Sequence, residues 1–288
     1  MALRSGRALP CAAVTAKAVP PQKVTLTGVP ETMLWTLHNR AREAQRPGTF
    51  LHDPTCVRLY ESIDYDFDRS FGKPDLTHPL RSQLFDRAVR PWLAAHPGGA
   101  VVELAAGLET QFQRCDDGQV QWYCVDLPEA LAVRERLLPA TPRCRYIAKS
   151  ALDLSWLDEI DASRGVCLTA QGLLMYLEPA AVQQLVTALL ARFAGVELIF
   201  DTIPRWFSRK TLQGYHKTQD YRAPRMPWGV DRNELEPLLR SWSPGVESVE
   251  LVPFDYAFGT FFSLQRLLSR LPKLRHRVAV VAHVRGRA

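Results

Sequence analysis

The sequence has no apolar run of about 18 residues, the length that a membrane-spanning helix needs. It has no C-x-x-C pair either, and its six cysteines follow no regular spacing. These absences argue against a membrane protein, a zinc site and a disulfide framework. We therefore expect a cytoplasmic protein with free thiols and without a bound metal.

The chain also lacks a block of basic residues. Its formal net charge is +6, but Lys and Arg are spread along the sequence, which predicts a solvated Arg-rich surface rather than a nucleic-acid partner. Residues 1–22 contain no acid and no apolar core, and they are rich in Ala and Pro. This composition predicts a disordered extension rather than a secretion signal.

The remaining residues, 23–288, are predicted to form one α/β domain. An N-terminal part, residues 23–98, has helical apolar spacing over residues 31–46 and 80–92. Short β-rich runs then alternate with helical patterns, which is typical of a mostly parallel sheet with helices on both faces. We predict strands at residues 100–104, 120–125, 145–148, 166–170, 196–201, 246–254 and 277–284, and helices at 129–138, 179–193 and 259–269.

Residues 101–110 read Val-Val-Glu-Leu-Ala-Ala-Gly-Leu-Glu-Thr, an apolar strand that leads into a turn of small residues. The next predicted strand ends in Asp126. Such a turn lets the backbone approach a nucleoside, and the acid accepts hydrogen bonds from ribose hydroxyls. Because the turn lacks the G-x-G-x-x-G spacing of dinucleotide sites, S-adenosylmethionine is favoured over a nicotinamide cofactor. Residues 99–201 are thus the predicted cofactor-binding core.

Three further stretches carry a resemblance: Leu-Thr-Gly-Val-Pro-Glu-Thr at residues 26–32, Ser-Ala-Leu-Asp-Leu-Ser-Trp at 150–156 and Gly-Leu-Leu-Met-Tyr-Leu at 172–177. With the turn, they resemble the leucine carboxyl methyltransferase family, and within it a bacterial branch that methylates polyketides. The resemblance runs over residues 24–242. It implies a class I S-adenosylmethionine-dependent methyltransferase fold with a seven-stranded, mostly parallel sheet.

The resemblance also implies O-methyl transfer to a carboxylate or hydroxyl of a small-molecule acceptor, a polyketide or another secondary metabolite. Three alternatives stay open from the sequence. The protein could be a nicotinamide dehydrogenase, a protein C-terminal carboxyl methyltransferase, or a cofactor-binding protein without catalytic activity.

The resemblance assigns cofactor contacts to individual residues. Arg81 corresponds to an arginine that binds the cofactor's carboxylate, and Arg40 to a basic residue near the same group. Asp126 corresponds to the ribose-binding acid. The alternatives are an exposed charge for either arginine and a helix cap for Asp126. Leu152 and Asp153 correspond to a segment against adenine, and Asp153 could instead cap a turn.

The turn carries three more predicted cofactor contacts, Glu103, Ala105 and Gly107, and it departs from the family pattern at Ala105, Glu109 and Gln111. Ala105 stands where the family has glycine, and we expect this alanine to have a negative φ. Outside the turn, Gln171 is a further predicted cofactor contact, and it replaces a glutamate of the family pattern. An amide offers the cofactor's ammonium a hydrogen bond without a charge.

Residues 202–230 are predicted to cover the site, followed by a C-terminal part at 231–288. Aromatic and cationic side chains in the cover suit a planar acidic acceptor, and we predict contacts from Tyr215, Tyr221, Arg222 and Arg225. Trp228 is expected to pack instead. His216 and Tyr176 are weak candidates for a catalytic base, and a carboxylate acceptor needs none because it is ionised at neutral pH.

Overall fold

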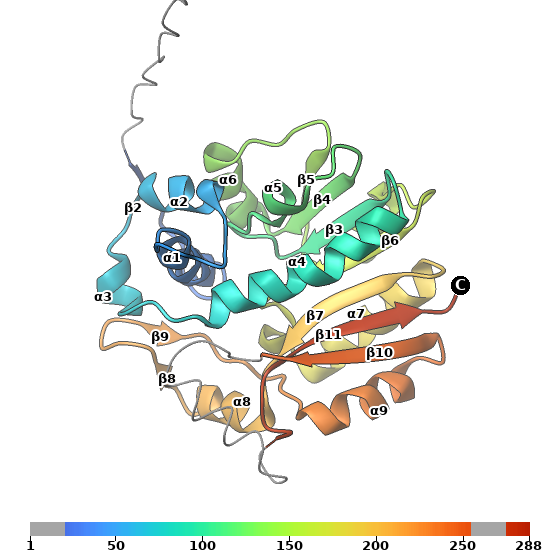
Figure 1. Ribbon diagram of the computed structural model, residues 1–288. Helices are drawn as coiled ribbons and strands as arrows, with labels where there is room; N and C mark the ends of the chain where they lie inside the picture. The colour runs from blue at the N-terminus through green and yellow to red at the C-terminus, as the bar shows by residue number, and fades with distance from the viewer. Residues whose placement is uncertain (1–20, 255–274) are drawn as a thin grey trace, which may run out of the picture.

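The computed structural model describes residues 21–254 and 275–288. Its centre is a seven-stranded sheet with the order β10-β11-β7-β6-β3-β4-β5 (Figure 1). Strands β3 to β7 are parallel, and β11 and β10 join them antiparallel at one edge. The strands are β3 Ala100–Leu104, β4 Gln121–Asp126, β5 Cys144–Ala148, β6 Val166–Ala170, β7 Glu197–Thr202, β10 Val246–Pro253 and β11 Val280–Gly286. The predicted fold is confirmed.

Helices cover both faces of the sheet because successive side chains of each buried strand point to opposite faces. Val101 of β3 belongs to a core with Phe85 of α4, whereas Val102 belongs to a second core with Val182 of α7. Figure 1 shows α4 in front of the sheet and α7 behind it. The helices on the two faces are α4 Thr77–Ala95 and α5 Gln111–Cys115, and α7 Pro179–Arg192 and α9 Arg232–Trp242.

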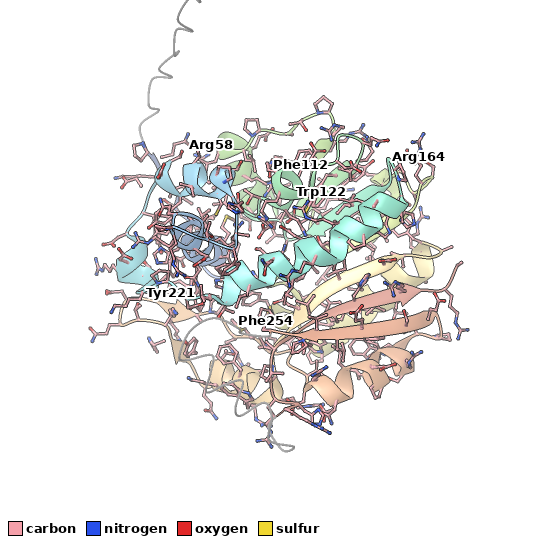
Figure 2. All side chains as sticks on the ribbon, viewed as in Figure 1. Arg58, Phe112, Trp122, Arg164, Tyr221 and Phe254 are labelled. Atoms are coloured by element: carbon pink, nitrogen blue, oxygen red, sulfur yellow. The ribbon has the colours of Figure 1, made fainter. Side chains whose placement is uncertain are left out.

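One aromatic contact shows how side chains pack on the sheet face that α4 and α5 cover. Phe112 of α5 meets Trp122 of β4 edge to face, with ring centroids 5.8 Å apart (Figure 2). Both side chains are buried, so the pair holds α5 and the turn before it against the sheet.

The N-terminal part builds a third core beside the sheet. The predicted helix at residues 31–46 is α1 Thr32–Ala44, whereas no helix was predicted within residues 49–79. Two short helices lie there, and Asp53 and Asp66 accept backbone N–H bonds at their starts. The elements are α2 Pro54–Glu61, α3 Phe67–Phe71, and the parallel pair β1 Gln22–Lys23 and β2 Ile63–Asp64.

The predicted bounds of the five parallel strands differ from the observed ones by at most one residue at either end. The predicted helix at residues 259–269 lies outside the described residues. Residues 1–20 of the predicted extension also lie outside the described residues. Of its last two residues, Gln22 belongs to β1 and pairs with Ile63 of β2. β11 begins at Val280, later than predicted.

The predicted cover contains α8 Arg205–Leu212 and a hairpin of β8 Tyr215–His216 and β9 Arg222–Ala223. The hairpin lies against the N-terminal part, where Thr218 Oγ1 donates to Ser70 O at 2.8 Å. The other elements are α6 Pro128–Leu137 and the 3₁₀ helices η1 Leu154–Glu159 and η2 Leu174–Tyr176. Among the described residues, no helix is long and apolar enough to cross a bilayer.

Candidate functional site

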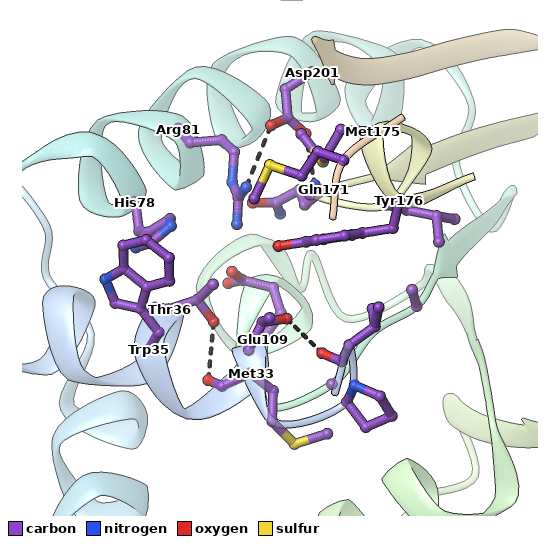
Figure 3. A pocket seen from close by; sticks show the side chains of 18 of the residues that line it. Met33, Trp35, Thr36, His78, Arg81, Glu109, Gln171, Met175, Tyr176 and Asp201 are labelled. Carbon is purple, nitrogen blue, oxygen red and sulfur yellow. Dashed lines mark hydrogen bonds and ion pairs between the residues drawn. The ribbon is translucent and has the colours of Figure 1, made fainter. Parts of the chain in front are cut away.

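A cavity of about 710 Å³ lies at the carboxyl ends of β3, β4, β6 and β7, bounded by α1, α4 and the cover (Figure 3). Ligands of open parallel sheets bind at this edge. The structure brings many of the predicted site residues together here. Those that line the cavity are Arg81, Glu103, Ala105, Gly107, Asp126, Leu152, Gln171, Tyr176 and Tyr215.

The first residue of the turn after β3 has a left-handed backbone conformation. Ala105 has a φ of +53°, so the expectation of a negative φ was wrong. Its N–H donates to Val125 O at 2.8 Å, and this bond holds the strained conformation. A left-handed alanine costs roughly 1–2 kcal/mol. Gly107 has a φ of +45°, and a Cβ there would lie 3.0 Å from Met33 Cβ, so the turn needs glycine at this point.

Asp126 ties this turn to the end of β4. Its two carboxylate oxygens accept the N–H groups of Gly107 and Leu127, each at 2.7 Å. Burial raises the pKa of Asp126. It does not cap α6 through its side chain, because the helix begins at Pro128 with Leu127 as its N-cap residue and has no side-chain cap. Each oxygen keeps a lone pair for a ligand in the cavity.

Sequence reasoning missed Arg134, which supports the same turn from below. This α6 side chain is fully buried, and its Nη1 donates to the carbonyls of Gly107 and Glu109 at 2.9 and 2.7 Å. Its spacing gave a signal, because residue 134 follows the buried Ala130 by four positions. The turn's carbonyls therefore point away from the cavity, toward a fixed cation.

Arg40 lies beneath the turn and does not line the cavity. It is fully buried, and it donates to Glu109 Oε1 at 2.9 Å and to Leu108 O at 2.8 Å. Arg114 donates to the same Glu109 oxygen at 2.8 Å. Burial alone would raise the pKa of Glu109, but these two guanidinium groups lower it to about 2. Arg40 is thus neither an exposed charge nor a residue at the cavity surface.

Arg81 lines the cavity from α4, and two contacts position it. Its Nη1 donates to Asp201 Oδ2 at 3.2 Å, and Asp201 Oδ1 accepts the N–H of Gly172 at 2.6 Å. Gly172 has a φ of +62°, where a side chain would strain the backbone, and a Cβ there would lie 2.6 Å from Arg81 Nη1 and displace the guanidinium group. Among the described residues, Arg81 Nε has no partner.

The departure at residue 171 leaves polar atoms available. Gln171 Nε2 donates to Gln111 Oε1 at 3.4 Å, whereas Gln171 Oε1 has no partner among the described residues. Glu103 is also buried, and it accepts Trp122 Nε1 at 3.1 Å. Burial raises the pKa of Glu103 to about 7.

Several predicted residues lie away from the cavity lining. Asp153 is exposed and accepts Ser155 N at 3.1 Å, so it caps η1. His216, Arg222 and Arg225 are exposed on the hairpin and the segment after it, and they do not line the cavity.

The aromatic residues of the cover likewise include some that line the cavity and some that do not. Tyr221 is buried against Phe71, with ring centroids 4.8 Å apart, and belongs to the N-terminal core. Trp228 packs on Phe200, as expected. Tyr215 lines the cavity, and Tyr176 extends its ring across it (Figure 3). Burial raises the pKa of Tyr176 to about 12.

The structure adds lining residues beyond the predicted contacts: Trp35, Asp75, His78, Phe207 and Lys217. Phe207 and Lys217 belong to the predicted cover, whereas His78 lies two residues before the predicted helix start at residue 80, so only the longer α4 places it on one face with Arg81. The others come from segments that meet only in the folded chain.

Comparison with known proteins identifies the family of this chain. The profile of the leucine carboxyl methyltransferase family matches residues 34–190. The chain is 32% identical over 191 residues to the tetracenomycin polyketide synthesis O-methyltransferase TcmP of Streptomyces glaucescens, covering 65% of this chain and 71% of TcmP. The chain belongs to the leucine carboxyl methyltransferase family.

A second relative and a solved structure are also similar to the chain. An S-adenosyl-L-methionine-dependent methyltransferase of Gibberella zeae is 28% identical over 202 residues, covering 62% of this chain and 67% of that protein. The crystal structure of the CurJ carbon methyltransferase superposes with a TM-score of 0.51 at 13% identity, covering 90% of this chain and 68% of that one. The protein is a class I S-adenosylmethionine-dependent methyltransferase, as the sequence predicted.

Proposed function

We propose that this methyltransferase transfers the methyl group to a carboxylate or hydroxyl oxygen of a small, largely apolar acceptor such as a polyketide. The observation that carries the proposal is that one cavity joins a polar strand-end region to an apolar wall. That wall includes Met33, Trp35, Met175, Phe207 and Met226. The name of TcmP, a polyketide O-methyltransferase, supports the same acceptor class. We further propose a cytoplasmic location, which the buried free cysteines suit.

The residues present fit the cofactor. We assign Asp126 to the ribose, Leu152 to the adenine, Arg81 to the carboxylate and Gln171 to the ammonium group. Two buried atoms without partners among the described residues, Arg81 Nε and Gln171 Oε1, support the last two assignments, because buried polar atoms normally have partners. Arg40 acts through Glu109 and the turn instead of touching the cofactor.

The cofactor supplies a methyl group already activated on a sulfonium. The chain therefore has to align the acceptor oxygen and exclude water, and we assign the second task to the apolar wall of the cavity. A carboxylate is ionised at neutral pH and needs no base. With its pKa raised to about 12, Tyr176 is a neutral hydrogen-bond donor at pH 7. His216 is exposed and does not line the cavity, so we assign it no catalytic role.

A labelled-methyl transfer assay tests the proposal. Three kinds of acceptor are compared: aromatic polyketide-like acids, the corresponding phenols with the carboxylate esterified, and a protein with a C-terminal leucine. Label on either small-molecule class, with none on the protein, supports the proposal. Label on the protein alone would contradict it and favour a protein carboxyl methyltransferase.

Calorimetry with S-adenosylhomocysteine separates binding from transfer. We expect binding and a raised melting temperature, because a ligand of the folded state stabilises it. Binding without transfer to any acceptor would favour a non-catalytic cofactor-binding protein.

A further inference from the structure

A polar cluster lies at the end of the cavity between α1 and α4, and the assignments above leave it unused. Asn39 Nδ2 lies 3.0 Å from Asp75 Oδ1 and 2.9 Å from His78 Nδ1. Lys217 Nζ donates to Asp75 Oδ2 at 3.0 Å. Asp75, His78 and Lys217 line the cavity, whereas Asn39 is buried behind them.

The orientation of the Asn39 amide follows from its contacts. The backbone N–H of Asp75 donates to Asn39 Oδ1 at 3.3 Å, so that atom is the carbonyl oxygen and the other is the amide nitrogen. An amide nitrogen only donates. His78 Nδ1 must therefore accept, and the proton of the neutral ring resides on Nε2.

The surroundings keep this ring neutral. Burial lowers the pKa of His78 to about 3, and the charge of Arg81 acts in the same direction. Lys217 and Arg40 add to the lowering, whereas Asp75 opposes it. With Nδ1 engaged and Nε2 protonated, the ring has no lone pair with which to act as a base.

The Nε2–H group is a donor without a partner in the described parts of the chain. No hydrogen bond from it is present among residues 21–254 and 275–288, and the ring borders the cavity. Trp35 meets the ring edge-on, with centroids 5.4 Å apart, and fixes its position. His78 precedes Arg81 by three residues on α4, which places both side chains on one face of the helix (Figure 3).

We propose that His78, held by Asn39 in its Nε2–H form, donates a hydrogen bond to a carboxylate bound beside Arg81. This inference rests on the proposed function. The carboxylate is either that of the cofactor or that of the acceptor, since both offer the same anionic oxygens. A neutral donor next to Arg81 adds direction to the contact without adding charge.

Two substitutions at residue 78 test the proposal. His78→Gln keeps an N–H donor at similar reach, whereas His78→Leu removes it at similar volume. We expect His78→Leu to bind the ligand that supplies the carboxylate about tenfold or more weakly than the wild type, which is the usual loss for a hydrogen bond to a charged group. His78→Gln should stay near the wild type. If the loss is in S-adenosylhomocysteine affinity, the cofactor supplies the carboxylate; if it is in the acceptor's KM, the acceptor does. Equal behaviour of the two variants in both measurements overturns the proposal.

Nuclear magnetic resonance of the ¹⁵N-histidine-labelled free protein provides a second readout, with the His78 signals assigned by their loss in His78→Gln. We expect the proton on Nε2 and ring shifts that stay constant between about pH 5.5 and 8. A proton on Nδ1, or titration near the ordinary histidine value of about 6.5, overturns the proposal. This result does not depend on methyl transfer. A wild type that binds no S-adenosylhomocysteine would instead count against the proposed function.

Discussion

Arg81 Nη1 lies 3.2 Å from Asp201 Oδ2, although the two residues are 120 positions apart in the chain. The ion pair joins α4 to the end of β7 and leaves Arg81 Nε without a partner among the described residues. Both side chains are buried, so the geometry of this contact is well defined. The arginine is thereby positioned at the cavity before a ligand arrives.

We predict that Arg81→Ala weakens S-adenosylhomocysteine binding by about 1.5–3 kcal/mol, the usual loss for a hydrogen bond to a charged group. Isothermal calorimetry measures the change, and circular dichroism checks that the variant is folded. Arg225→Ala is the matched control, because this arginine is exposed and outside the cavity lining. Equal S-adenosylhomocysteine affinities of the two variants would show that Arg81 does not contact the cofactor.

Ala105→Gly is expected to stabilise the protein. Glycine relieves a left-handed strain of roughly 1–2 kcal/mol at a φ of +53°, which exceeds the roughly 0.4–1 kcal/mol of extra unfolded-state entropy. The control is Ala106→Gly, a buried neighbour outside the positive-φ region, which should destabilise. Thermal unfolding of both variants makes the comparison. A lower melting temperature for Ala105→Gly would contradict the left-handed turn.

Glu103 predicts a specific pH dependence of stability. Its pKa in the folded protein is raised by burial from 4.5 to about 7, so the folded state retains a proton that the unfolded state has lost. This contribution is present below pH 4.5 and is lost as pH rises to about 7, at up to about 1.4 kcal/mol per pH unit. The variant Glu103→Gln should gain stability relative to the wild type over that window. Denaturant titrations at several pH values test this, and parallel curves would refute it.

Gln171→Glu is expected to tighten cofactor binding. Gln171 Oε1 has no partner among the described residues, and a carboxylate there would give the cofactor's ammonium a charge-assisted hydrogen bond. We expect a several-fold lower Kd for S-adenosylmethionine by calorimetry. Weaker binding would show that the amide at this position serves another group, such as an acceptor carboxylate that a glutamate would repel.

The acceptor wall is tested by Phe207→Ala, because Phe207 lines the cavity from α8. We expect a higher KM for the acceptor and nearly unchanged cofactor affinity. Arg222→Ala, in an exposed residue that sequence analysis had assigned to the acceptor, should stay near the wild type in both. A higher acceptor KM for Arg222→Ala and an unchanged one for Phe207→Ala would indicate instead that the acceptor binds at the hairpin.

Local patterns in the sequence were sufficient for the sheet. Five short, mostly apolar runs alternate with helical patterns, and this order predicts a mostly parallel sheet with helices on both faces. The small-residue turn and Asp126 were visible for the same reason, because they lie next to strand ends. The short helices α2 and α3 were not predicted, since helices of eight and five residues show too little periodicity.

The roles of individual charged residues needed the tertiary structure. Arg40 and Arg81 both occur in predicted helices, yet Arg40 contacts Glu109 beneath the turn and Arg81 contacts Asp201 at the cavity. The sequence determined the fold and the cofactor class, because both depend on neighbouring residues. Only the folded chain decided which arginine borders the cavity and which nitrogen of His78 carries the proton. A buried charge or ring depends on partners that distant segments supply.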